Sequence, residues 1–158
     1  QEFGLRSGTE NTVSIMGASL ALEIACKMKD KESARLSALR DYGIEQILKL
    51  TDYKIILNGD KENRLPNNIN ISVFGISSEL LVIELDAKGI MVSEKSACSS
   101  KDEGQSHVIN AIHNKAGIKP DSVSGSIRIS LGRHTTKKDM DILVKSLKDI
   151  FSKYKSFK

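Results

Sequence analysis

Apolar residues recur every three or four positions through the first third of the chain, which is the spacing of amphipathic helices. One helix is predicted to begin after residue 12, and its apolar stripe consists of Val13, Met16, Leu20, Ile24 and Met28. Thr9, Asn11 and Thr12 precede this stripe and belong to the residue types that cap helix N-termini. A second helix is predicted over residues 31–50, with an inward stripe of Leu36, Leu39, Ile47 and Leu50.

Strand-like patterns follow in the middle of the chain. Residues 53–57 are mostly apolar and end at Asn58-Gly59, which predicts a short strand followed by a turn. Residues 60–68 are polar and contain a proline, which predicts a loop. Apolar and polar residues then alternate over 69–74, as in a strand with one buried face.

A helix and a short strand are predicted next. Ser77 and Ser78 are able to cap a helix over residues 80–85, and Gly89 suits its C-terminal end. The apolar run Ile90-Met91-Val92 then predicts a short strand.

The helix and strand patterns continue in the last third of the chain. A helix is predicted over residues 105–115, with Gly117 as its stop and an inward stripe of Val108, Ile109 and Ile112. Residues 127–131 alternate between apolar and polar types, which predicts a strand that packs its apolar side on helices. Arg128 then lies on the opposite face of this strand.

The predicted elements sum to about five helices and four short strands in mixed order. This order favours the α+β class, with a small and mostly antiparallel sheet covered by helices. A length of 158 residues suits one domain with a real core. No apolar run approaches the roughly 18 residues that cross a bilayer, and no signal peptide opens the chain. We therefore expect no membrane association.

The positive charge is concentrated at the C-terminus. Thr136 and Asp139 have capping-box spacing before a last helix, whose apolar stripe is Met140, Leu143, Leu147, Ile150 and Tyr154. Residues 137–158 hold seven Lys and three Asp, which accounts for the net charge of +4. A solvated helix face explains this excess, and a docking surface for an acidic partner or RNA is the alternative. No interleaving of aromatic and basic residues indicates direct nucleic-acid binding.

The two cysteines do not form a disulfide framework, which favours a reducing, cytoplasmic compartment. Cys26 lies within a helical apolar pattern and is expected in the core. The chain has no CxxC motif, and His107 and His113 are not spaced to share one helix face as metal ligands. His134 is isolated, and we expect no metal site.

Cys98 is the candidate for chemistry. It lies in Ser96-Ala97-Cys98-Ser99-Ser100, where small and hydroxylic neighbours leave a thiol accessible and are able to donate hydrogen bonds to a thiolate. A lone cysteine is more often a small apolar filler. Two further segments change this balance: Arg6-Ser7-Gly8-Thr9-Glu10-Asn11 and Ser126-Ile127-Arg128-Ile129-Ser130-Leu131-Gly132-Arg133.

These three segments, in this order and spacing, resemble the C-terminal part of cysteine desulfurases of the NifS/IscS type. Those proteins are pyridoxal-phosphate (PLP) enzymes of the class V aminotransferase group. The resemblance runs from Gln1 to about Phe157, nearly the whole chain. It implies the small C-terminal domain of a fold-type I PLP enzyme. Residues 1–12 would be a loop from the cofactor-domain side, and residues 13–158 the small domain with an active-site cysteine loop at 94–105.

The resemblance implies roles for three residues. The cysteine matching Cys98 takes sulfur from the substrate as a persulfide. The arginine matching Arg128 binds the carboxylate of L-cysteine, which suits the paired donors of a guanidinium. The threonine matching Thr9 contacts the PLP phosphate of the neighbouring subunit, which implies a homodimer. A plain helix cap and an exposed strand arginine are the structural alternatives for Thr9 and Arg128. Arg133 is expected to be structural.

Two departures from the family pattern matter. Lys95 stands where the family usually has Gly before the Ser-Ala-Cys triplet, so the loop backbone there is open to question. The Ser-x-His-Lys segment with the PLP lysine does not occur in these 158 residues. The isolated chain is therefore expected to be inactive, because the lysine that anchors PLP is absent.

The resemblance implies that the intact enzyme converts L-cysteine to L-alanine. It would deliver sulfur to an acceptor protein, either an iron–sulfur scaffold or a tRNA-thiolation protein. Two alternatives remain open: a stand-alone persulfide carrier, and a non-catalytic interaction or dimerisation module. A selenocysteine lyase is a further possibility within the family.

Overall fold

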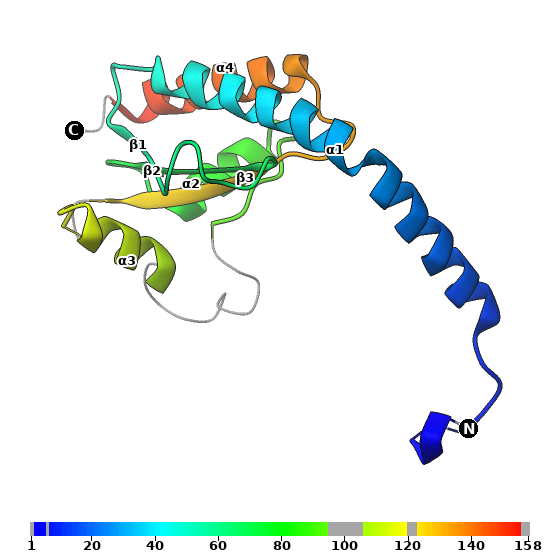
Figure 1. Cartoon of the computed structure of the whole chain (residues 1–158). Coiled ribbons are helices and arrows are strands. Elements are labelled where there is room, and N and C mark those ends of the chain that lie inside the picture. Colours follow the sequence, from blue (N-terminus) through cyan, green and yellow to red (C-terminus); the bar gives the residue numbers. More distant parts are fainter. Residues whose placement is uncertain (1, 6, 95–105, 120–122, 156–158) are drawn as a thin grey trace. The chain divides into compact units, whose positions relative to one another are not determined.

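The structure is a computed structural model that describes residues 2–5, 7–94, 106–119 and 123–155 (Figure 1). It divides into two compact units, Gln1–Ser33 and Ala34–Lys158. The elements in chain order are a 3₁₀ helix η1 (Glu2–Gly4), α1 (Thr12–Leu48), β1 (Ile55–Leu57), β2 (Asn68–Val73), α2 (Ser78–Asp86), α3 (His107–Lys115), β3 (Gly125–Ser130) and α4 (Lys137–Lys155). Within the described residues, no helix is both long and apolar enough to cross a membrane.

Helix α1 is one continuous helix of 37 residues, where the sequence predicted two. The predicted break at residues 29–30 holds only Lys and Asp, and neither Gly nor Pro interrupts the helical backbone there. Asn11 caps the N-terminus, since its side-chain Oδ1 accepts a hydrogen bond from the backbone N–H of Ser14 at 3.1 Å. The prediction of a cap at this position is confirmed for Asn11.

The apolar stripe on the part of α1 in the first unit is exposed. The exposed fractions of Val13 and Met16 are 81% and 73%. Cys26 is also exposed, so its predicted place in the core is wrong. The periodicity correctly predicted that one face of the helix is apolar. It did not predict whether other residues of the unit cover that face.

The second unit is built on a three-stranded antiparallel sheet in the order β1-β2-β3. The register pairs Ile69 with Ile129 and Asn70 with Arg128. The predicted strand at residues 90–92 is wrong, because only an isolated bridge between Ser93 and Arg128 forms there. The reason is local, since the N–H of Ile90 donates to a carbonyl at the end of α2 and is not available to a strand.

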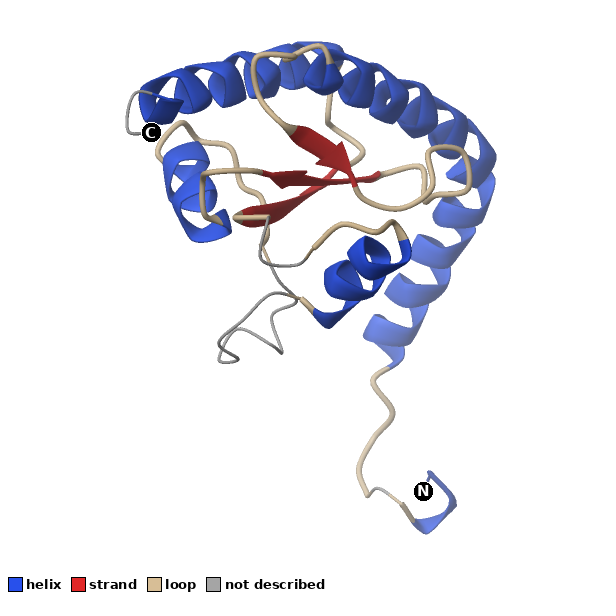
Figure 2. Ribbon diagram, turned by 90° about the vertical axis from the view of Figure 1, so that its left-hand side faces the viewer, coloured by secondary structure: helices blue, strands red, loops and turns tan. Residues whose placement is uncertain are grey.

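One face of the sheet carries the core of the second unit. Helices α2, α4 and the C-terminal part of α1 pack on this face, and Figures 1 and 2 show α4 on the side of the sheet away from α3. The most deeply buried members are Ile44, Ile47, Ile69, Ile71, Leu81, Leu85, Ile127, Met140, Leu147 and Ile150. The predicted α+β class and its small antiparallel sheet are confirmed.

The helix caps in this unit follow the sequence closely. The Oγ of Ser77 accepts from the N–H of Leu80, which confirms the N-cap of α2. Thr136 and Asp139 bond reciprocally at the start of α4, which confirms the capping pair. Gly89 adopts a φ of +75° just after α2, a conformation that few side chains tolerate.

Helix α3 lies on the other face of the sheet (Figure 2). Ile109 is buried as predicted, whereas Val108 is exposed. The residue that shares the inward stripe with Ile109, one helical turn later, is the fully buried His113.

Candidate active site

Arg128 lies in the middle of β3, on the face away from the apolar core. Its neighbours Ile127 and Ile129 are buried, and the Arg128 side chain is exposed, as strand alternation predicts. The backbone of Arg128 pairs with Ser93 on the edge of β3 that faces away from β2. The Arg128 N–H donates to the Ser93 carbonyl at 2.7 Å, and the Ser93 N–H donates to the Arg128 carbonyl at 3.1 Å. These two bonds fix the chain at Ser93 against the strand that carries Arg128.

The segment with Cys98 follows closely in sequence. Glu94 follows Ser93 and is the last described residue before the segment that contains Cys98. Cys98 and Lys95 lie outside the described residues, so the predictions for both stay predictions. The chain therefore enters the predicted cysteine loop from a residue that is hydrogen-bonded to Arg128.

Asn70 of β2 lies directly opposite Arg128 in the sheet. Because the backbone groups of Arg128 point away from β2, this is a non-hydrogen-bonded pair, the type in which side chains approach closest. Both side chains project from the polar face. Ser126 and Ser130 lie on the same face of β3.

A largely buried polar cluster, made of the buried Asn58, Ser72 and His113 and the half-buried Asn70, joins this face to α3. The Nε2 of His113 lies 2.9 Å from Oδ1 of Asn58 and 3.2 Å from Oγ of Ser72. The Nδ2 of Asn58 donates to Oδ1 of Asn70 at 2.7 Å and to Oγ of Ser72 at 2.8 Å. Sequence reasoning missed this cluster, although a histidine one helical turn after a buried isoleucine was a usable signal.

The surroundings of His113 disfavour its protonated form. Its side chain is fully buried among uncharged partners, and this burial lowers its pKa below the ordinary value. With Oδ1 of Asn58 as acceptor, Nε2 carries the proton. Nδ1 has no hydrogen-bond partner within the described part of the chain, so a second proton there would be a buried and unpaired donor.

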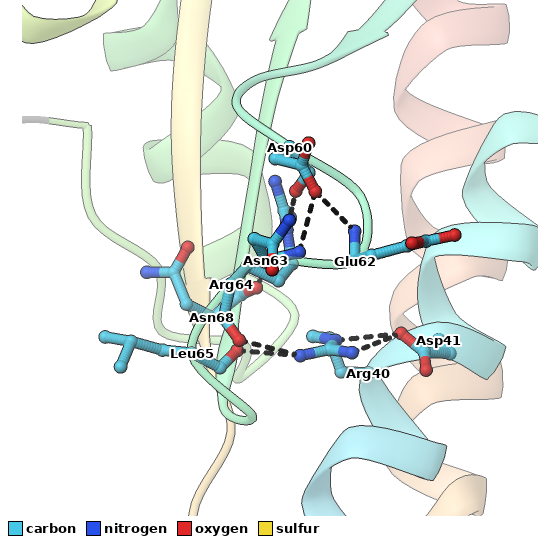
Figure 3. Close-up of polar contacts among 8 residues, drawn as sticks. All are labelled: Arg40, Asp41, Asp60, Glu62, Asn63, Arg64, Leu65 and Asn68. Atoms are coloured by element: carbon cyan, nitrogen blue, oxygen red, sulfur yellow. Dashed lines mark hydrogen bonds and ion pairs between the residues drawn. The ribbon is translucent and has the colours of Figure 1, made fainter.

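The loop between β1 and β2 is fixed by two arginines, as Figure 3 shows. Arg40 of α1 is buried, and its Nη1 donates to the carbonyl oxygens of Arg64 and Leu65 at 3.2 and 3.1 Å. Arg64 in turn donates to the carbonyl oxygens of Asp60 and Asn58. Arg64 thus fixes the backbone carbonyl of Asn58, while the side-chain amide of Asn58 bonds to the polar cluster.

Asp60 shapes the tip of the same loop (Figure 3). Its Oδ1 accepts the backbone N–H groups of Asn63 at 2.7 Å and Glu62 at 2.8 Å. These hydrogen bonds stabilise the charged carboxylate and lower the pKa of Asp60. The polar loop predicted from composition is therefore an ordered turn.

The turn after β3 is held by Arg35 of α1. Its guanidinium donates to the carbonyl oxygens of Gly132, Arg133 and Thr135 at 3.2, 2.9 and 2.9 Å. The Arg133 side chain is exposed, so the backbone of Arg133, through its carbonyl, is the part that serves the fold.

Thr9 belongs to the first unit and is exposed. The side chain of Asn11 caps α1, so the Thr9 hydroxyl is not needed for the cap. Gly8, directly before it, has a φ of +120°. Arg6 lies outside the described residues. The structure places Thr9 and Arg128 in separate units, and the predicted role of each stays a prediction.

Residues 1–143 match the model of the family "Aminotransferase class-V". The chain belongs to this family. Within it, the matched relatives are cysteine desulfurases of the IscS and NifS type, which confirms the resemblance drawn from the three sequence segments.

Two relatives and two solved structures illustrate the similarity. Cysteine desulfurase IscS of Dictyoglomus turgidum is 41% identical over 99% of this chain and 38% of its own length. Cysteine desulfurase NifS of Azotobacter vinelandii is 35% identical over the same shares.

Among solved structures, a NifS-like protein superposes with a TM-score of 0.76 at 30% identity, over 96% of this chain and 37% of its own. A NifS-like protein from Rickettsia africae gives 0.70 at 26% identity, over 96% and 38%. The chain thus spans well under half the length of the relatives it matches.

Proposed function

We propose that the protein carrying this chain is a PLP-dependent cysteine desulfurase, and that this chain supplies its small domain. The observation that carries the proposal is the attachment of Ser93 to the backbone of Arg128, since the segment with Cys98 starts from that point. Identity of about 40% with cysteine desulfurases over nearly the whole chain supports the same activity.

Arg128 is the proposed ligand of the substrate carboxylate. A guanidinium on an exposed strand face offers paired N–H donors that match the two oxygens of a carboxylate. The two backbone bonds to Ser93 and the buried isoleucines on either side fix the position of its Cα. L-cysteine would be oriented with its thiol toward the segment that carries Cys98.

Cys98 is the proposed sulfur acceptor. Its thiolate would form a bond to the substrate sulfur while the carbon–sulfur bond of L-cysteine breaks and the carbon takes up a proton. The net reaction converts L-cysteine and the Cys98 thiol to L-alanine and a Cys98 persulfide. A serine-rich sequence around Cys98 suits stabilisation of a thiolate by hydrogen bonds.

Thr9 is the proposed contact to the PLP phosphate. Its exposed hydroxyl precedes the N-terminus of α1 and is not engaged in the cap, which fits a phosphate contact. Bound PLP would supply the electron sink that lets the carbon–sulfur bond break. The PLP lysine lies outside this chain, so we expect the isolated chain to release no sulfide from L-cysteine. Sustained release with added PLP would contradict this expectation.

The cysteines provide the test of this function. In the intact protein with PLP, Cys98→Ser should abolish formation of L-alanine from L-cysteine, while Cys26→Ser, the matched control, should leave it unchanged. Mass spectrometry should find one added sulfur atom on Cys98. Sulfur loading of Cys98 from a donor without PLP would favour a stand-alone carrier, and full function of Cys98→Ser would favour an interaction module.

The remaining steps of the proposal concern partners. In a homodimer, Thr9 would serve the PLP of the neighbouring subunit, and the persulfide would pass to an iron–sulfur scaffold or a tRNA-thiolation protein. The lysines that α4 contributes at the C-terminus supply positive charge for an acidic acceptor surface. Addition of a candidate acceptor should accelerate turnover in a salt-dependent manner.

A further inference from the structure

Asn70 and Arg128 place two hydrogen-bond donors side by side on the polar face of the sheet. They are cross-strand partners in a non-hydrogen-bonded pair, for which Cβ atoms lie roughly 4.5–5.5 Å apart. The guanidinium of Arg128 has donors only, and its side chain is exposed. The carboxamide of Asn70 has one acceptor and one donor group. Its orientation therefore decides whether the oxygen or the N–H group lies next to Arg128.

The polar cluster decides that orientation. His113 approaches Oδ1 of Asn58 with Nε2, which leaves Nδ2 of Asn58 as donor to Oδ1 of Asn70 at 2.7 Å. The oxygen of Asn70 is thereby engaged on the β1 side of the sheet. Its Nδ2 donates to no acceptor within the described part of the chain.

Two adjacent donor groups, with no acceptor from the described residues between them, leave room for an anion. A carboxylate provides two acceptor oxygens, and the guanidinium and the amide N–H group are able to bind one or both. We propose that Asn70 is a second carboxylate-binding residue for the amino-acid substrate, next to Arg128. This inference rests on the proposed function of Arg128.

A purely structural role predicts something different for Asn70. Such a role would use only Oδ1, which accepts from Asn58, and any side chain with an acceptor in that place would serve. The substitution Asn70→Ser separates the two roles, because it removes the amide N–H next to Arg128 without adding a charge there. The substitution Asn70→Asp keeps the acceptor and the shape but replaces the N–H donors by a second acceptor. That acceptor would repel a substrate carboxylate and bind Arg128 in its place.

The test compares four variants of the intact, PLP-loaded protein with L-cysteine: Asn70→Asp, Asn70→Ser, Asn68→Asp and Arg128→Lys. Asn68→Asp is the matched control, since Asn68 lies on the same strand and face but opposite Ser130. We expect Asn70→Asp to raise KM at least tenfold, Asn70→Ser to raise it about tenfold, and both to change kcat less. Asn68→Asp should leave KM within about twofold.

The outcomes separate the two proposals. Equal KM values for Asn70→Ser and Asn68→Asp, with a raised KM for Arg128→Lys, would overturn the role of Asn70 alone. An unchanged KM for Arg128→Lys would overturn the assignment of Arg128 and with it this inference. Should Asn70→Asp melt at a lower temperature, the KM of the correctly folded Asn70→Ser decides, since a structural defect lowers active fraction and kcat but not affinity.

Discussion

Nε2 of His113 on α3 lies 2.9 Å from Oδ1 of Asn58 at the end of β1, which joins two residues 55 positions apart in sequence. The contact is fully buried on the His113 side, and every partner of the imidazole is uncharged. A protonated ring would place a cation among neutral amides, with a new N–H that meets no acceptor described in the structure. The stability of the chain is therefore linked to the protonation of this histidine.

The first prediction concerns pH. Burial lowers the pKa of folded His113 below its ordinary value of 6.5, so the unfolded chain binds more protons than the folded chain below that pH. The free energy of unfolding should therefore be fully supported above about pH 6.5 and fall as the pH drops from there toward the lowered folded pKa. Urea unfolding of the chain at pH 7.5 and 5.5 measures the difference.

A matched pair of variants assigns this pH dependence. His113→Gln replaces the imidazole by a neutral donor and should flatten the change between pH 7.5 and 5.5, with some loss of stability at both. His107→Gln, on the exposed first turn of the same helix, should retain the wild-type dependence. A wild-type slope in His113→Gln would show that another group is responsible.

The second prediction concerns the arginines of the β1–β2 loop. Arg40→Met should lower the free energy of unfolding by roughly 2–3 kcal/mol, because the carbonyl oxygens of Arg64 and Leu65 lose their donor in a buried place. Asp41 pairs with the same guanidinium but is 52% exposed, so Asp41→Asn should change stability by about 1 kcal/mol or less. Equal losses in both variants would mean that the ion pair, not the carbonyl contacts, holds the loop.

The third prediction concerns Arg128. Arg128→Lys keeps the charge but replaces a planar pair of donors by a point charge, so KM for L-cysteine in the intact protein should rise about ten- to hundredfold. Arg133→Lys is the control, because its exposed side chain lies beyond β3 and only its carbonyl serves the fold. Steady-state kinetics across a range of L-cysteine concentrations distinguishes the two variants. A similar KM for both would remove Arg128 from the proposed carboxylate site.

The sequence predicted best those features that are set by residues close together in the chain. Alternation over residues 127–131 predicted both the buried isoleucines and the exposure of Arg128, because a strand has only two faces. The caps at Ser77 and Thr136 were equally predictable, since each depends on atoms within one helical turn. Local geometry decides these features, and the sequence contains it.

Features that depend on other elements, or on where a helix ends, were not predictable. Ile90-Met91-Val92 is apolar enough for a strand, but the Leu85 carbonyl at the end of α2 accepts the N–H of Ile90. Cys26 follows a helical apolar pattern, but no described residue of its own unit covers that face. The cluster of Asn58, Asn70, Ser72 and His113 brings together distant segments, and the helical spacing of His113 from Ile109 indicates only that the histidine faces inward, not which residues it meets. For the candidate site, the alternation predicted the exposed face of Arg128 and its buried neighbours.

The last prediction compares two glycines in the same helix. A Cβ built on Gly43 of α1 would lie 2.3 Å from Cε of Met140 and 3.1 Å from Cδ1 of Ile69, so α1 meets α4 and the sheet closely at this point. A Cβ on Gly17 would meet no atom within 4 Å. Gly43→Val should therefore lower the free energy of unfolding by about 1–3 kcal/mol through overpacking.

Gly17→Val should raise the free energy of unfolding slightly, by up to about 0.5 kcal/mol, because valine forms helices better than glycine. Denaturant titration of both variants of the chain, with helix content followed by circular dichroism, measures the two effects on one scale. The difference between them isolates packing, since the change in side chain and in helix propensity is the same at both sites. If Gly43→Val were as stable as Gly17→Val, the terminal methyl of Met140 would have moved aside at no cost, and the close approach of α1 to α4 would not constrain the core.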